Sequence, residues 1–167
     1  MEINLIPYGH QNINQSDLEE VLKSLQSDFL TTGPLVSLFE EKLSHVTGAP
    51  TISVSSGTAA LHCAFKAINL KKGDEVILTT HEHVGNAAPW LNRQKLHGIV
   101  LRKYTPAKTA AETLDRINKL INKNTRAIAT PHIPCTQGQV LPVKEICTLA
   151  RDKGLYSLID GADGAGM

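Results

Sequence analysis

The alternation of helix-patterned and strand-patterned segments is the feature that most constrains the fold of this chain. Short apolar, β-branched runs are separated by stretches in which apolar residues recur at helical spacing. The expected strands are residues 51–54, 75–79, 99–102, 126–130 and 155–159. Strands that alternate with helices form parallel sheets with crossover helices on their faces. The sequence therefore predicts an α/β fold with a mostly parallel sheet and helices on both faces.

Composition excludes several classes of protein and partner. The 167 residues are 41% hydrophobic and 20% charged, which is typical of a globular domain and not of a disordered chain. The net charge of +1 and the 4% of aromatic residues provide neither a basic surface nor a stacking platform for nucleic acid. No apolar run reaches the roughly 18 residues of a membrane span, and no charged, apolar leader opens the sequence. We expect a cytoplasmic protein without nucleic-acid or membrane partners.

Unusual polar residues follow the ends of several predicted strands. They lie in residues 55–58, 80–86, 132–137 and 160–163. The carboxyl ends of parallel strands share one edge of the sheet, and ligands of open α/β sheets bind there. We therefore expect a ligand site built from these loops.

The turn at Ser56, Gly57 and Thr58 has two interpretations. As a phosphate site, Gly57 would let the backbone turn sharply and admit a ligand, and Thr58 would open a helix whose free N–H groups attract anions. As an ordinary strand-to-helix turn, Ser56 and Thr58 would act as helix caps. No Gly-Lys-Ser/Thr follows, so this is not a nucleotide-binding P-loop.

Asp160 stands at the end of an apolar strand, where a carboxylate needs a hydrogen-bonded or cationic partner. A protonated heterocycle, a metal or a lysine would suit it, and a turn or helix cap is the structural alternative. His81 and His83 lie on one side of an extended segment. They could bind a metal with Asp160 or His132, contact a flat ligand, or lie in a solvated loop.

The three cysteines, Cys63, Cys135 and Cys147, form neither a disulfide framework nor a CxxC metal site. We therefore predict no metal centre and a reducing compartment. Cys135 could be a nucleophile, but a small buried residue is the simpler interpretation.

Two groups of motifs have a family resemblance. Residues 30–34, 39–40 and 55–61 resemble the DegT/DnrJ/EryC1/StrS sugar aminotransferases. Residues 81–90 and 138–146, together with Asp160-Gly161-Ala162 and Gly166, resemble class V aminotransferases, closest to cysteine desulfurases and isopenicillin N epimerases. Both groups belong to the fold-type-I enzymes that use pyridoxal 5′-phosphate (PLP). The resemblance implies a large domain like that of aspartate aminotransferase.

The resemblance also implies roles for individual residues. Ser56, Gly57 and Thr58 match the turn at the cofactor phosphate. His83 matches the residue that stacks on the pyridine ring, with a possible catalytic role. Asp160 matches the carboxylate that pairs with the pyridinium nitrogen. Two positions differ from class V enzymes: Asp163 lies near the cofactor's phenolic oxygen, where Gln or His is usual, and Cys135 replaces an Asn of the desulfurases.

The same resemblance implies the organisation of the chain. Residues 1–50 would form an amino-terminal helical segment, and residues 51–167 the first part of the cofactor-binding large domain, apparently incomplete at its carboxyl end. The family's Schiff-base lysine lies on a later strand, and no lysine here has a matching context. Lys144, for example, lies in a predicted helix.

The leading hypothesis is therefore a PLP-dependent enzyme that acts by Schiff-base chemistry on an amino acid or another small amino-bearing substrate. Transaminase, lyase and epimerase activities all stay open, with an inclination to class V. A DegT-type sugar aminotransferase is one alternative, and a non-catalytic remnant with a binding role is another. Family members are usually homodimers, so we expect a second copy as partner.

Overall fold

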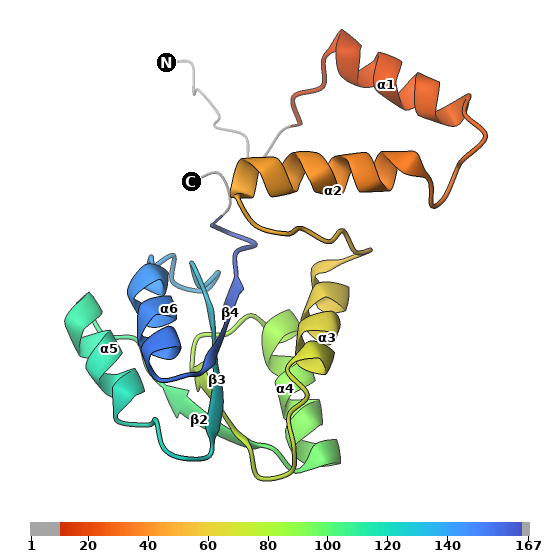
Figure 1. The fold of residues 1–167 in the computed structure, drawn as a ribbon. Helices are drawn as coiled ribbons and strands as arrows, with labels where there is room; N and C mark the ends of the chain where they lie inside the picture. The colour runs from red at the N-terminus through yellow and green to blue at the C-terminus, as the bar shows by residue number, and fades with distance from the viewer. Residues whose placement is uncertain (1–10, 165–167) are drawn as a thin grey trace, which may run out of the picture. The chain divides into compact units, whose positions relative to one another are not determined.

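The structure is a computed structural model that describes residues 11–164; Gly166, one of the motif residues, lies outside this range. The chain divides into two compact units, one up to Ser53 and one from Val54 onward. The helices and strands of both units carry the labels of Figure 1. None of the helices within residues 11–164 combines the length and the apolar character that crossing a membrane requires.

The first unit contains two helices, α1 (Gln15–Leu25) and α2 (Pro34–Thr47). The cap of α1 is reciprocal: Asn14 Oδ1 accepts from the Asp17 N–H, and the Asp17 carboxylate accepts from the Asn14 N–H at 2.8 Å. Such a capping box satisfies two N–H groups that a helix start leaves free. Helix α2 ends at Gly48, whose φ of 69° is the left-handed conformation that glycine adopts without strain.

The strand predicted at residues 51–54 is absent from the structure. The N–H of Ser53 donates to Glu40 Oε1 at 2.8 Å, and the N–H of Thr51 donates to Ser44 Oγ at 2.9 Å. Side chains of α2 therefore accept the hydrogen bonds that these N–H groups would otherwise donate to a neighbouring strand. The prediction was wrong because β-branched residues favour an extended backbone but do not supply a pairing partner.

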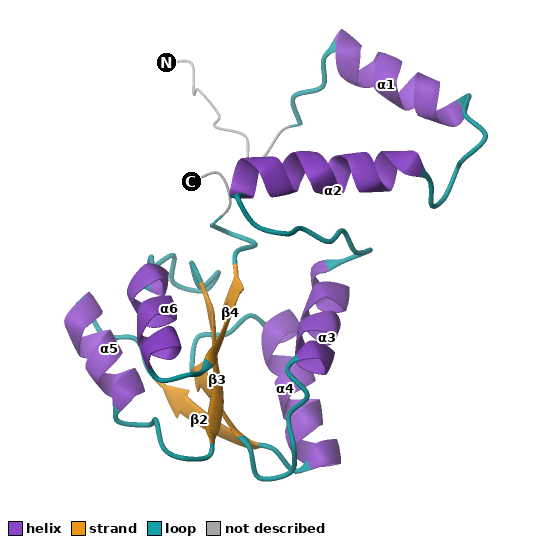
Figure 2. Cartoon of the chain, in the orientation of Figure 1, coloured by secondary structure: helices purple, strands orange, loops and turns teal. Residues whose placement is uncertain are grey.

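The second unit is built on a four-stranded, all-parallel sheet in the order β2-β1-β3-β4. The strands are β1 (Glu75–Thr79), β2 (Val100–Tyr104), β3 (Thr125–Pro131) and β4 (Tyr156–Asp160). The helices are α3 (Gly57–Ala67), α4 (Val84–His97), α5 (Ala110–Asn118) and α6 (Val143–Asp152). Figures 1 and 2 show α3 and α4 on one face of the sheet and α5 and α6 on the other. The predicted fold class is confirmed, as are the four strands from 75–79 onward, with ends shifted by at most two residues.

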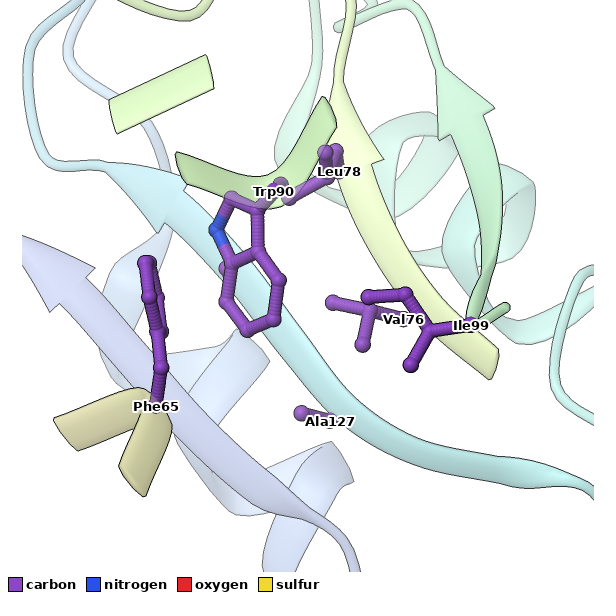
Figure 3. Close-up of a cluster of buried hydrophobic side chains, with 7 residues drawn as sticks. Phe65, Val76, Leu78, Trp90, Ile99 and Ala127 are labelled. Atoms are coloured by element: carbon purple, nitrogen blue, oxygen red, sulfur yellow. The ribbon is translucent and has the colours of Figure 1, made fainter. Parts of the chain in front are cut away.

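Strand β1 lies in the middle of the sheet, and all five of its residues are buried. Its side chains alternate between two cores. Val76 and Leu78 pack with Phe65 of α3 and Trp90 of α4, where the two aromatic ring centres are 4.0 Å apart (Figure 3). Ile77 packs on the other face, with side chains of α5 and α6. This two-sided burial explains why β1 is apolar at consecutive positions.

A buried carboxylate marks the amino end of β1. Glu75 is 5% exposed and accepts from Arg102 Nε at 3.1 Å, Arg102 Nη2 at 3.0 Å and Asn122 Nδ2 at 2.7 Å. These bonds connect β1 to β2 and to the segment before β3. The Arg102 guanidinium holds the pKa of the Glu75 carboxyl below its ordinary value.

We predict that Glu75→Gln lowers the free energy of unfolding at neutral pH by about 1–3 kcal/mol, because hydrogen bonds to a charged group are lost. A lowered pKa means that this stabilisation is present above the ordinary carboxyl pKa of about 4.3 and is lost as the pH falls through the lowered value. Urea unfolding at neutral and acidic pH should therefore show a difference from wild type that shrinks in acid. Glu112→Gln, at an exposed position of α5, is the control. Equal stability of Glu75→Gln and wild type at neutral pH would contradict this role.

Candidate functional site

The loops after β1, β3 and β4 meet at one edge of the sheet. The chain passes from β1 to β2 on one side and then to β3 on the other, so the crossover direction reverses beside β1. The His132 N–H, just after β3, donates to the Asp160 carbonyl at 2.8 Å. Gln137 Nε2 lies 3.2 Å from His81 Nε2. This edge is a topological switch point, where ligands of open α/β sheets bind.

Two neighbouring cavities open at this edge. The main cavity has a volume of about 590 Å³, and its walls include Gly57, Thr58, His83 and Asp160. The small cavity has a volume of about 180 Å³ and is lined by His83 and Asp160 again, now with Cys135 and Asp163 among others. His83 and Asp160 therefore border both spaces. The structure brings together the residues that the sequence placed on separate loops.

The amino end of α3 supplies one wall of the main cavity. Ser56 is the N-cap, and its hydroxyl accepts from the Ala59 N–H at 3.2 Å. Ser56 itself lines neither cavity. In residues 11–164 no group accepts a hydrogen bond from the N–H of Gly57 or Thr58, which are the first two residues of the helix. These free N–H groups and the helix dipole favour an anion.

Of the two properties predicted for Gly57, a sharp turn and access for a ligand, the structure is consistent only with the second. Its φ is not in the left-handed region, so the backbone conformation does not require glycine. A Cβ placed there would meet no atom within 4 Å, so packing does not require glycine either. What the absent side chain leaves open is space at the wall of the main cavity.

His83 is held in place by its own helix. It is the N-cap of α4, and its Nδ1 accepts from the Gly85 N–H at 3.0 Å. In the neutral ring this assigns the proton to Nε2. A Cβ on Gly85 would lie 3.1 Å from His83 Nδ1, so glycine gives the ring room to cap the helix.

Asp160 combines the two roles considered for it. It ends β4, and its Oδ1 accepts from the Ala162 N–H at 3.1 Å, which forms a tight turn. Its Oδ2 has no hydrogen-bond partner in residues 11–164. One oxygen therefore fixes the side chain, and the other can receive a ligand.

Two other predicted residues have unexpected surroundings. Cys135 is exposed, so its interpretation as a small buried residue is wrong. His132 packs so closely against Gly164 that a Cβ at that position would collide with the imidazole ring, and it lines neither cavity. In the described part of the chain, no three His, Cys, Asp or Glu side chains are grouped as metal ligands. The geometry gives no support to the histidine-based metal alternative.

Sequence reasoning missed a buried polar cluster beside the cavities, which contains Glu82, Asn86, Tyr104 and Thr130. The Tyr104 hydroxyl lies 2.8 Å from Thr130 Oγ1, and burial raises the pKa of Tyr104 to about 12. Burial also raises the pKa of Glu82 to about 7. The sequence did contain an indication of this cluster, because Glu82 lies between His81 and His83, the two histidines considered as ligands.

We predict that Gly85→Ala displaces the His83 ring and weakens its cap on α4. Relative to Gly57→Ala, which has the same gain in helix propensity, the free energy of unfolding should be lower by about 1 kcal/mol, as expected for a lost N-cap. The ring nitrogen shifts of His83 in ¹⁵N NMR should change at the same time. Gly57→Ala is the matched control, because its Cβ enters open space. Identical His83 shifts in both variants would contradict the close contact.

Comparison with known sequences identifies the family. The sequence profile of the DegT/DnrJ/EryC1/StrS aminotransferase family matches residues 11–167. A protein named "probable cysteine desulfurase" from Halalkalibacterium halodurans is 30% identical over 125 residues, which is 72% of this chain and 31% of that protein. The UDP-4-amino-4,6-dideoxy-N-acetyl-beta-L-altrosamine transaminase of Campylobacter jejuni serotype O:23/36 is 42% identical over 77 residues, covering 46% of this chain and 20% of that enzyme.

Solved structures show the same fold. The cysteine desulfurase CsdA of Escherichia coli superposes with a TM-score of 0.70 at 20% identity, over 96% of this chain and 39% of that one. Spr1654 of Streptococcus pneumoniae, which is named as a sugar aminotransferase and was solved in its PLP form, superposes with a TM-score of 0.67 at 22% identity. The match covers 90% of this chain and 38% of that one. The chain spans between a fifth and two fifths of the length of these four proteins. It belongs to the DegT/DnrJ/EryC1/StrS aminotransferase family, which is PLP-dependent and has the fold-type-I architecture.

Proposed function

We propose that this chain forms the phosphate-binding and ring-binding part of a PLP-dependent enzyme that acts on a small amino-bearing substrate. The observation that carries the proposal is the main cavity, which joins the free amino end of α3 to His83 and Asp160. These are the three features that a phosphorylated, protonated pyridine ring requires. They come from separate segments of the chain and border one space.

The amino end of α3 fits the phosphate group of the cofactor. The N–H groups of Gly57 and Thr58 are free to donate, and the helix dipole adds attraction for a dianion. The space left by the absent Gly57 side chain lets phosphate oxygens approach the backbone. Ser56 acts indirectly in this proposal, because its hydroxyl holds the first turn of the helix.

His83 and Asp160 fit the pyridine ring. The His83 imidazole, held by the Gly85 N–H, provides a flat surface at the wall of the cavity. The Asp160 carboxylate favours the protonated form of a nearby ring nitrogen because opposite charges attract. PLP, when bound with that nitrogen protonated, withdraws electrons from the reacting carbon of the substrate. The contribution of this chain is to hold the proton at the ring nitrogen and to fix the orientation of the ring.

Two parts of the proposal depend on groups other than these. No lysine of residues 11–164 lines either cavity, so the proposal assigns the Schiff-base role to none of them. Asp163 is exposed and borders only the small cavity, where its charge is largely solvated. The assignment of Asp163 beside the phenolic oxygen is a prediction from the resemblance.

Among the possible reactions, we propose transamination of a sugar substrate first. Membership of the DegT family favours it, and so does the 42% identity to a nucleotide-sugar transaminase. Cysteine desulfuration, a class V reaction, is the second candidate, supported by the similarity to a desulfurase over 72% of this chain. Incubation of the full-length protein with an amino donor and a nucleotide-linked keto sugar, or with L-cysteine, separates the two. The readouts are amino-sugar formation and sulfide release.

The proposed enzyme acts as a homodimer, as the resemblance implies. Sedimentation velocity of the full-length protein distinguishes one copy from two. A monomer at micromolar concentration would contradict this part of the proposal and leave the cofactor site unaffected.

We predict that Asp160→Asn weakens binding of pyridoxamine 5′-phosphate at least about tenfold, which is about 1.4 kcal/mol. This ligand has no aldehyde, so calorimetry measures the site without Schiff-base formation at lysines. Asn can still accept from the Ala162 N–H, so the turn is preserved and only the charge is lost. Asp152→Asn, an exposed acid on α6, is the matched control.

The same titration tests the phosphate site. Pyridoxamine, which has no phosphate, should bind the wild-type protein much more weakly than its phosphate ester. Equal binding of the two ligands would contradict the placement of the phosphate at α3. Equal binding of pyridoxamine 5′-phosphate by wild type and Asp160→Asn would contradict the role of Asp160.

A further inference from the structure

An acid–amide pair next to His83, formed by the half-buried Glu82 and the buried Asn86, has no role in the proposed function. Asn86, which is 2% exposed, donates from Nδ2 to Glu82 Oε2 at 2.5 Å. Glu82 Oε1 and Asn86 Oδ1 are also buried, and neither has a hydrogen-bond partner within residues 11–164. Buried polar atoms without partners are rare and costly.

One proton would satisfy both unpartnered oxygens. An ionised Glu82 has only acceptors, as does the amide oxygen of Asn86, so the two oxygens cannot bond each other. A proton on Glu82 Oε1 would supply the donor that Asn86 Oδ1 lacks, since the two side chains already pair through Oε2 and Nδ2. The pair would then share two parallel hydrogen bonds, one in each direction.

The charges around Glu82 favour this neutral form. Burial is the main cause that raises the pKa of Glu82 to about 7. Hydrogen bonds from Asn86 and from the Thr79 backbone act in the opposite direction, and the negative charge of Asp160 adds a smaller increase. Tyr104 on β2 is uncharged at that pH, because its pKa is about 12. Lys103 is the nearby cation, lining a small space with Glu82, but its side chain is exposed and its charge is screened by water. The remaining titratable neighbours are His81 and His83 on the same loop.

The pair spans the turn that holds the His83 ring. Glu82 directly precedes His83, the N-cap of α4, and Asn86 lies in the first turn of that helix. The Asn86 N–H donates to the His83 carbonyl at 3.0 Å. Between them lies Gly85, whose N–H donates to the His83 ring. A change in the Glu82–Asn86 pair therefore acts on the segment that orients His83.

We propose that Glu82 is a positioning residue whose protonated carboxyl pairs with the Asn86 amide through two hydrogen bonds and thereby holds His83 at the cofactor cavity. Ionisation of Glu82 removes one of the two bonds, places a second negative charge near Asp160, and loosens the first turn of α4. The effect of Glu82 on cofactor binding rests on the proposed function. The protonation of Glu82 and its effect on the first turn of α4 do not depend on that function.

NMR of the ligand-free protein tests the pair directly. With ¹³C-labelled glutamate, the Glu82 carboxyl should titrate with a midpoint near 7, well above the ordinary value of about 4.3. The Gly85 amide signal, which reports the His83 hydrogen bond, should move with the same midpoint. In Glu82→Gln, two amides keep both hydrogen bonds at every pH. The change in the Gly85 signal that follows the ionisation of Glu82 should therefore disappear. A Glu82 carboxyl that is already ionised at about pH 5.5, or identical Gly85 titrations in both proteins, would overturn the proposal.

Binding of pyridoxamine 5′-phosphate tests the consequence. A carboxyl with a pKa of about 7 is only about one-thirtieth protonated at about pH 8.5. The Kd of wild type relative to that of Glu82→Gln should therefore rise by up to about 30-fold between about pH 6 and pH 8.5. This ratio cancels the titration of the ligand itself. Glu112→Gln should follow wild type.

The two proposals fail in different ways. A ratio that does not change with pH would contradict the positioning role of Glu82. Absence of binding by both proteins at either pH would contradict the proposed function, while the NMR titration would still decide the state of Glu82.

Discussion

The parallel pairing of β1 with β2 on one side and β3 on the other is the constraint on which the rest of this structure depends. A strand paired on both edges and covered on both faces favours apolar residues at consecutive positions, and residues 76–78 provide them for two separate cores. The same pairing forces the chain to reverse its crossover direction next to β1. The strand order therefore brings together the loops after β1, β3 and β4, although no sequence motif links these loops to one another.

The residues at the site serve first as ends of helices and strands. Ser56 and His83 are N-caps, and Asp160 closes the turn after β4. Each therefore has its orientation set by a backbone N–H before any ligand arrives. Such preorganisation lowers the entropy lost on binding. The structural roles that the sequence offered as alternatives are therefore present at these positions, and they are compatible with the proposed binding roles of His83 and Asp160.

The sequence predicted the fold well because periodicity reports burial, and burial decides where β1 to β4 and the helices lie. The site prediction rests on residues that end elements, since Gly57, His83 and Asp160 are unusual at such points. The structure places them around one cavity, and their roles toward a cofactor stay predictions. The sequence predictions failed where a structure depends on contacts with residues that are distant in the sequence. Residues 51–54 have the composition of a strand, but α2 takes their N–H groups. The state of Glu82 depends on burial and on Asp160, which is distant in sequence.

The ion pair at the amino end of β1 and the acidic groups beyond its carboxyl end are separated by the length of that strand. The four steps from Glu75 to Thr79 span about 13 Å. Glu75 and Arg102 together carry no net charge, so their field falls steeply with distance. The Glu75 carboxyl gains its proton only in acid, because its pKa is lowered, whereas Glu82 ionises near pH 7. The sheet and the Glu82–Asn86 pair therefore respond to different ranges of pH.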